Sequence, residues 1–251
     1  MIIPHKVSVE VCAFALESCL NAQQAGASRI ELCGGLYEGG TSPSSGLISL
    51  VKKSVDLDLF VMIRPRGGDF LYSESEINTM IEEIELTKKL GADGIVLGIL
   101  KKNGEVNLEL TKQLVEQAFP MKVTFHRAID VTPNAIEALE MIIESGCERI
   151  LSSGQQNKAI DGLNTISQMV EKSAGRIEIM AGSGVNAENA HFFLEKGVNA
   201  LHLTGKSIRQ SGMEYRKKTV QMGEFDGISE FEIVYSDYEK IKAIVEIANK
   251  F

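Results

Sequence analysis

A Glu-x-Cys motif occurs twice near the start of the chain, as EVC at positions 10–12 and as ELC at positions 31–33. Each motif lies in a β-type run in which apolar residues alternate with the Glu and the Cys. Successive side chains of a strand point to opposite faces, so the carboxylate and the thiol of each motif share one face. The second motif opens into a loop rich in small residues, positions 34–46. We therefore expect two carboxylates and two thiols on the same side of a sheet.

The motif cysteines, Cys12 and Cys33, are candidate ligands for a soft metal ion such as Cu(I). Neighbouring parallel strands lie about 4.8 Å apart, so two such sulfurs can share one ion. Two sulfurs do not complete a tetrahedral zinc site unless His126 or His202 joins them. Cysteine is also a small residue that proteins commonly bury without any further role. The spacing alone leaves metal binding and core packing both open.

Ionisable residues stand at the ends of five β-type runs, and in four of these runs they lie on the face opposite to the apolar residues. In a barrel of parallel strands this face points inward, and the carboxyl ends of the strands form the active-site mouth. The fifth run, FVMIRPRGG, is less decisive, and either Arg64 or Arg66 ends near the mouth. A single buried Glu–Arg pair is commonly structural, so no one of these residues identifies a site. Their convergence predicts a pocket for acid–base chemistry. The candidate catalytic residues are Glu10, Glu31, Arg64, His126 and His202.

Glycine-rich loops follow the last two predicted strands, MAGSGV at 180–185 and LTGKS at 203–207. Small residues let backbone N–H groups approach an anion, and barrels of this class bind phosphate after strands seven and eight. The run RPRGG at 64–68 suits a bidentate arginine clamp, although Arg66 and Asp69 alternatively pair only to hold their own loop. Tight turns require glycine in any case. The predicted anion-binding residues are Arg66, Gly182, Ser183, Gly184, Thr204 and Gly205.

The elements that position these residues alternate along the chain. Helix patterns occur near 13–25, 46–55, 75–90, 107–118, 133–145, 157–173 and 187–196, and several end at a glycine. The predicted strands are Lys6–Val11, Arg29–Leu32, Leu59–Ile63, Gly94–Leu97, Lys122–Phe125, Arg149–Leu151, Arg176–Met180 and Ala200–Leu203. Eight strands separated by helices predict a (β/α)8 TIM-like barrel of the α/β class. An open doubly wound sheet is the alternative, disfavoured because no GxGxxG follows the first strand.

Composition and charge narrow the function classes. The net charge of −8 disfavours a nucleic-acid partner, and no apolar run reaches the roughly 18 residues of a membrane span. Four scattered cysteines and the lack of a signal-peptide pattern indicate reduced thiols and a cytoplasmic protein. We expect a single domain, 1–251, with the barrel at about 5–205 and a C-terminal extension at 206–251. Within the extension, FEIVYS resembles a strand and SDYEKIKAIVEIANKF a capped helix.

Several stretches together resemble the CutC family of copper homeostasis proteins. They include RIELCGGLYEGGTSPSSG at 29–46, IRPRGGDFLYS at 63–73, VTFHRAID at 123–130 and GRIEIMAGSGV at 175–185. The resemblance implies a TIM-like barrel, a cytoplasmic location and a homo-oligomer, dimer or tetramer. It also implies a copper role, with the family's two candidate Cu(I) cysteines falling on Cys12 and Cys33.

Two functions follow as hypotheses. In the first, the chain takes part in copper homeostasis and its ligand is a Cu(I) ion. In the second, it is a TIM-barrel enzyme with lyase- or isomerase-type acid–base chemistry, or a sensor, and its ligand is a small phosphorylated or carboxylated metabolite. The first hypothesis requires accessible soft ligands but gives no role to the inward acids and bases. The second hypothesis gives a role to those acids and bases and to the glycine-rich loops.

Overall fold

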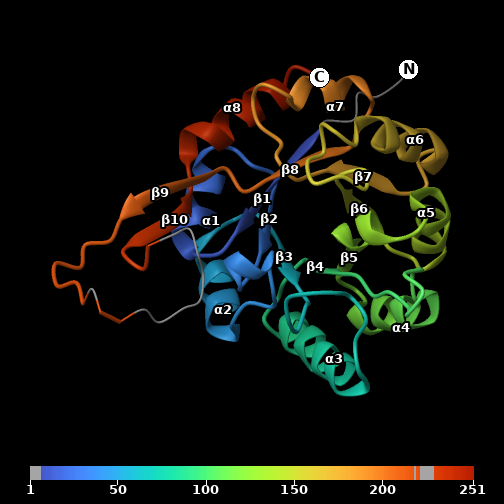
Figure 1. Cartoon of the computed structure of the whole chain (residues 1–251), viewed down its shortest axis with the longest axis horizontal. Helices are drawn as coiled ribbons and strands as arrows, with labels where there is room; N and C mark the ends of the chain where they lie inside the picture. The colour runs from blue at the N-terminus through green and yellow to red at the C-terminus, as the bar shows by residue number, and fades with distance from the viewer. Residues whose placement is uncertain (1–6, 218, 221–228) are drawn as a thin grey trace.

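Eight parallel strands close into a barrel in the computed structural model, which describes residues 7–217, 219–220 and 229–251 (Figure 1). The predicted TIM-like fold is confirmed. The barrel strands are β1 (Ser8–Ala13), β2 (Arg29–Leu32), β3 (Asp58–Met62), β4 (Gly94–Leu97), β5 (Lys122–Phe125), β6 (Arg149–Ser152), β7 (Glu178–Ala181) and β8 (Ala200–Leu203). The first and last residues of each predicted strand lie within two residues of the observed bounds. Lys6, predicted as the start of the first strand, falls outside the described residues.

Helices surround the barrel and cover its outer face (Figure 1). They are α1 (Leu16–Gln24), α2 (Ser45–Ser54), α3 (Glu74–Lys89), α4 (Leu108–Ala118), α5 (Ala135–Glu144), α6 (Leu163–Ser173), α7 (Ala190–Glu195) and α8 (Tyr238–Ala248). The helix predicted from 157 begins later, because residues 157–162 form turns. The glycines after α1 and α3, Gly26 and Gly91, have φ of 84° and 80°, a conformation that glycine adopts without steric cost.

The alternation of side chains in β1 determines what faces the barrel interior. Val9 and Val11 join the large apolar core between strands and helices, whereas Glu10 and Cys12 point into the barrel. The register places Glu10 opposite His202 of β8 and Cys12 opposite Glu31 of β2. The two Glu-x-Cys motifs therefore stand side by side inside the barrel.

The C-terminal segment adds a hairpin and a helix (Figure 1). Strand β9 (Lys206–Gln210) pairs antiparallel with β10 (Glu232–Ser236), and this two-stranded sheet projects from the side of the barrel. Helix α8 begins at the predicted cap, where the Asp237 side chain accepts hydrogen bonds from the N–H groups of residues 239 and 240. It packs against α7, α1 and β1, so the stretch expected as an extension contains the helix that closes the surrounding ring. Among the described residues, no helix combines the length and the apolar character that crossing a membrane requires.

Candidate functional site

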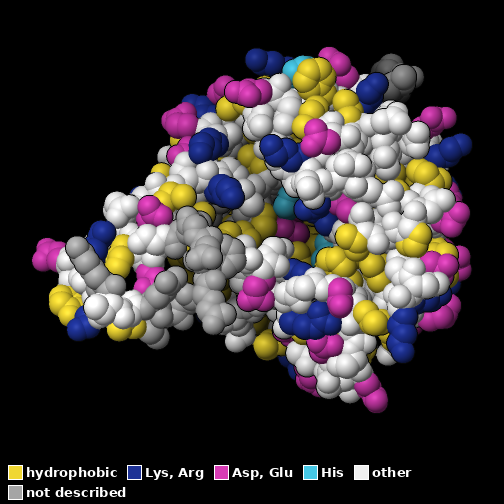
Figure 2. All heavy atoms as spheres, viewed as in Figure 1, with side chains coloured by type: hydrophobic (Ala, Val, Ile, Leu, Met, Phe, Trp, Pro, Cys, Tyr) yellow, Lys and Arg dark blue, Asp and Glu magenta, His cyan; other side chains and the backbone are white. Residues whose placement is uncertain are grey.

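A cavity of about 470 Å³ opens at the carboxyl ends of the barrel strands. Figure 2 shows the mouth as a hollow in which histidine, acidic and basic side chains come together. Its volume is in the range of small-molecule sites. The ionisable residues in its lining include Glu31, Arg64, His126, Arg127, His202 and Lys206.

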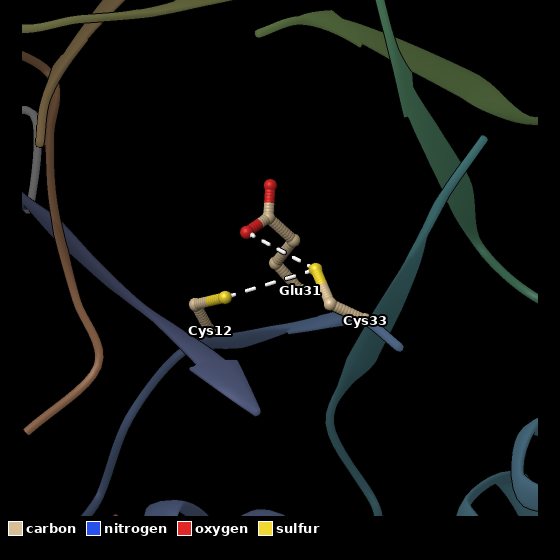
Figure 3. A group of neighbouring side chains, drawn as sticks. All are labelled: Cys12, Glu31 and Cys33. Carbon is tan, nitrogen blue, oxygen red and sulfur yellow. Dashed lines mark hydrogen bonds between the residues drawn. The ribbon is translucent and has the colours of Figure 1, made fainter. Parts of the chain in front are cut away.

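The two motif thiols lie next to each other, with the Glu31 carboxylate beside them (Figure 3). The Cys12 Sγ donates to the Cys33 Sγ at 3.7 Å, and the Cys33 Sγ donates to the Glu31 Oε2, also at 3.7 Å. Cys12 is 6% exposed and Cys33 is 0% exposed. Both pack in a small apolar cluster that includes Phe60 and Met62, so the thiols are part of the barrel interior and do not stand at its rim. Only Cys12 reaches the cavity lining.

Both thiols are protonated at neutral pH. The hydrogen bond with Cys33, together with burial, raises the pKa of the Cys12 thiol well above its ordinary value. For Cys33, the hydrogen bond from Cys12 lowers the pKa, but burial and the neighbouring Glu31 outweigh it and raise the pKa to about 11. Metal ions bind to thiolates and not to thiols, so an ion that binds here must displace the proton of each thiol.

Glu31 and His202 form a buried ion pair above the thiols. The His202 Nε2 lies 3.0 Å from the Glu31 Oε2. Burial opposes the charged imidazolium, but the Glu31 carboxylate outweighs it, and the pKa of His202 is raised well above its ordinary value. Burial opposes the charge of Glu31 too, yet His202 holds the pKa of the Glu31 carboxyl below its usual range. Ligand atoms of Cys12, Glu31 and Cys33 lie within 4.8 Å of one another, as do those of a second group, Glu10, Glu31 and His202.

His126 enters the cavity from the end of β5 as a neutral imidazole. Its Nδ1 accepts the Ala128 N–H at 3.2 Å, so the ring proton resides on Nε2. Burial and the nearby Arg64 lower the pKa of His126 to about 4. Gly98 makes the room for this ring, since a Cβ there would lie 2.5 Å from its atoms.

The two arginines of the RPRGG run have different roles. The Arg64 guanidinium donates to the backbone carbonyls of Glu38, Gly40 and Gly68, at 2.7 to 2.9 Å, and thereby holds the loops around the mouth. Arg66 lies outside the cavity lining and pairs with Glu76 at 2.5 Å and with Asp69 at 3.1 Å. The predicted clamp is therefore not formed, and the alternative in which Arg66 only holds its own loop describes the structure.

Glu10 does not reach the cavity, which corrects its prediction as a catalytic candidate. It is fully buried in the middle of β1, where its Oε2 lies 3.3 Å from Arg149 and 3.6 Å from Arg29. Its Oε1 lies 3.8 Å from the His202 Nε2. Glu10 is therefore part of an ion cluster beneath the site. No role was predicted for Arg29 and Arg149 from the sequence, because both are the first residues of their strands and the candidates were sought at the strand ends. Arg29 could have been found, since it stands two residues before Glu31 and shares its face.

The glycine-rich loops reach the mouth only in part. Ser183, Gly184 and Thr204 line the cavity, and an anion contact there stays a prediction. Gly182 and Gly205 are outside the lining. At Gly182 a Cβ would lie 2.4 Å from Leu151, so close packing explains that glycine. Lys206, the residue after Gly205, lines the cavity and was missed, although it belongs to the LTGKS run.

A protein-family model covers the barrel strands and the residues of this site. The model of the CutC family matches residues 7–207 of this chain. The chain belongs to the CutC family. A CutC family protein of Parabacteroides distasonis is 46% identical over 94% of this chain and 98% of its own length. A "Copper homeostasis protein cutC homolog" of Homo sapiens is 44% identical over 96% of this chain and 88% of its own length.

Solved structures agree with this assignment. The crystal structure of CutC from Streptococcus agalactiae has a TM-score of 0.75 and 36% identity, covering 79% of this chain and 98% of its own. A thiamine phosphate pyrophosphorylase from Pyrococcus furiosus has a TM-score of 0.60 at 14% identity, covering 98% of this chain and 97% of its own. The second likeness shows the barrel fold alone.

The neutral His126 makes the stability of this CutC protein depend on pH. Its folded pKa of about 4 lies below the ordinary 6.5, so its contribution is complete above pH 6.5 and is lost as pH falls toward 4. Between pH 7 and pH 5 we expect this residue to lower the free energy of unfolding by about 2 kcal/mol. Urea unfolding at both pH values measures this change. In His126→Gln the free energy of unfolding should fall by about 2 kcal/mol less between pH 7 and pH 5 than it does in the wild type. Equal pH dependence in the two proteins would contradict the assignment.

Proposed function

We propose that this chain takes part in copper homeostasis by binding one Cu(I) ion between Cys12 and Cys33. The observation that carries the proposal is the 3.7 Å separation of the two sulfurs. In zinc sites, metal–thiolate bonds of about 2.3 Å bring ligand sulfurs to a similar separation. Thiolates also select Cu(I) over the hard ions that a carboxylate alone would favour.

The neighbouring ion pair supports the same proposal. The Glu31 Oε2, 3.7 Å from the Cys33 Sγ, is a third donor on the same side of the barrel. Two thiolates and one Cu(I) carry a net negative charge, and the protonated His202, which also pairs with Glu31, offsets part of it. Cys12 lines the cavity and gives an ion access to the pair, while the burial of both sulfurs would keep the bound ion from exchange with other thiols.

The proposal places the protein in the cytoplasm as a homo-oligomer. The described cysteines are all free thiols, which is typical of a reducing compartment. Relatives from Mus musculus and Homo sapiens, each 44% identical, carry the description "Copper homeostasis protein cutC homolog". Location and assembly stay predictions.

An anaerobic titration against a chromogenic Cu(I) chelator tests the proposal. We expect the protein to withdraw one Cu(I) per chain from the chelator, and X-ray absorption to show two sulfur neighbours. A chelator that keeps all of its Cu(I) in the presence of excess protein would overturn the proposal.

A second candidate function is the binding and conversion of a small anionic metabolite. The cavity of about 470 Å³ is far larger than a metal ion needs, and this observation favours the second candidate. Lys206 and Arg127 line it and supply positive charge for a carboxylate or phosphate. A thermal-shift screen with phosphorylated and carboxylated metabolites should find ligands that raise the melting temperature. Failure of every anion to do so, at millimolar concentration, would remove this candidate.

A further inference from the structure

Three buried polar atoms of cavity-lining side chains have no hydrogen-bond partner among the described residues: the Glu31 Oε1, the His126 Nε2 and the Arg64 Nε. The other nitrogens of Arg64 already hold the loops around the mouth, so we consider Glu31 and His126. Both side chains line the cavity, and they are 2% and 4% exposed. Buried polar atoms are nearly always hydrogen-bonded, so an unpaired donor and an unpaired acceptor at one cavity call for a ligand that supplies both partners.

The two atoms have complementary roles. The Glu31 Oε2 is already bound by His202, which leaves Oε1 as a free acceptor. The His126 Nδ1 is occupied by the Ala128 N–H, which makes Nε2 a donor. The two side chains line the same cavity, Glu31 from β2 and His126 from the end of β5. The pair therefore fits a ligand with a hydrogen-bond acceptor opposite the His126 Nε2. The neighbouring atom of that ligand would carry a proton that the Glu31 Oε1 can take.

We propose that the cavity binds a small carbonyl compound bearing a carboxylate or phosphate, and that Glu31 and His126 exchange the proton on the carbon beside its carbonyl. The proposal rests on the second function above and names its substrate class and reaction. The carbonyl oxygen accepts from the His126 Nε2–H, and the Glu31 Oε1 stands over the neighbouring C–H bond. The anionic group lies toward Lys206, which makes no ion pair among the described residues.

The proposed step conserves atoms and electrons. The Glu31 Oε1 takes the proton, and the electron pair of the broken C–H bond becomes the C=C bond of an enolate. The carbonyl π pair moves to oxygen, where the His126 Nε2–H stabilises the new negative charge. Return of the proton from the Glu31 carboxyl to the same carbon re-forms the C–H bond, restores the carbonyl compound and leaves the Glu31 carboxylate ready for another exchange. No metal and no oxidant takes part.

The neutral state of His126 suits this role. A neutral imidazole polarises a carbonyl without giving up its proton to solvent. The charged groups that face the ring are Arg64 at the end of β3, Glu31 of β2 and Asp130, which follows β5. Burial and Arg64 lower the pKa of His126, and the two carboxylates raise it. Burial has the largest effect, so the pKa is about 4 and the ring is neutral.

Proton exchange in D2O tests the proposal, with pyruvate as the carboxylate probe and dihydroxyacetone phosphate as the phosphate probe. A copper chelator is present throughout, so the result does not depend on Cu(I) binding. By ¹H NMR we expect the C–H signal of one probe to disappear at least about 100-fold faster than in buffer. Glu31→Gln should return the rate to that of buffer, and His126→Gln should lower it about 100-fold. Glu76→Gln, which removes a surface carboxylate outside the cavity, should leave it unchanged.

Each outcome decides a separate point. Exchange at the buffer rate for both probes overturns the proposal, as does an unchanged rate in Glu31→Gln. A probe that raises the melting temperature without exchanging leaves the second function standing and removes only the proton transfer. Should Glu31→Gln fail to fold, ¹⁵N NMR of the wild type decides: a neutral ring protonated at Nε2 at pH 6 is required, and an imidazolium or an Nδ1–H tautomer overturns the proposal.

Discussion

A Cys12→Ser/Cys33→Ser double variant is expected to lose tight Cu(I) binding, with an apparent affinity lowered by more than about 100-fold. Loss of a residue that merely orients a ligand already costs about 10- to 100-fold, and here both soft ligands disappear. Serine keeps the size and the hydrogen-bonding capacity of the thiol, so the barrel should remain folded. Competition with a chromogenic chelator measures the affinity, and circular dichroism confirms the fold.

The other two cysteines provide a matched control. Cys19 of α1 and Cys147, just before β6, are also buried, and burial raises the pKa of each thiol to about 12. Among the described residues, neither belongs to a cluster of candidate metal ligands, so Cys19→Ser/Cys147→Ser should bind Cu(I) as the wild type does. Equal affinity in both double variants would show that Cys12 and Cys33 are not the ligands.

Replacement of Arg149 by Met is expected to destabilise the protein by about 3–5 kcal/mol. Arg149 lies 3.3 Å from the fully buried Glu10 and also contacts Glu178. Methionine fills much of the space of the arginine side chain but leaves Glu10 with only the more distant Arg29, at 3.6 Å, and His202, at 3.8 Å, as charged neighbours in the described part of the chain. Removal of the nearest partner from a buried ion cluster leaves a charge that water cannot reach and that the remaining partners compensate only in part. Urea unfolding at neutral pH measures the loss.

A surface arginine shows whether burial is the cause. Arg176 pairs with Glu140 but is 45% exposed, so Arg176→Met should lower the free energy of unfolding far less than Arg149→Met does. Adding Glu10→Gln to Arg149→Met removes the uncompensated charge and should restore part of the stability. A loss as small in Arg149→Met as in Arg176→Met would mean that the cluster is not a stabilising element.

The two proposals meet at Glu31. One of its oxygens, Oε2, faces His202 and Cys33, on the side of the proposed copper ligands. The other, Oε1, is the acceptor proposed for a carbonyl ligand. Because one carboxylate serves both, we expect Cu(I) and a small ligand to influence each other's affinity, by equal factors in the two directions.

Most of the fold follows from local patterns. Period-two alternation in runs such as KVSVEVC and RIELC, with helix-ending glycines such as Gly26 and Gly91, predicted eight strands close to their observed positions. These signals are local because strand faces and helix ends depend on neighbouring residues. Strand β9 was missed, since its only partner, β10, lies about twenty residues further along the chain.

The sequence by itself determined which side chains point into the barrel, because the alternation of a strand needs no partner to decide its inward face. Glu31, His126 and His202 were found in this way, whereas the alternation left open whether Arg64 or Arg66 reaches the mouth. Only the tertiary structure decided the depth of each group and its partners. Closure of the barrel placed Glu10 beneath the cavity with Arg149, a residue 139 positions away, and left one oxygen of Glu31 and one nitrogen of His126 unpaired. Depth and pairing depend on contacts between distant strands, which no local pattern records.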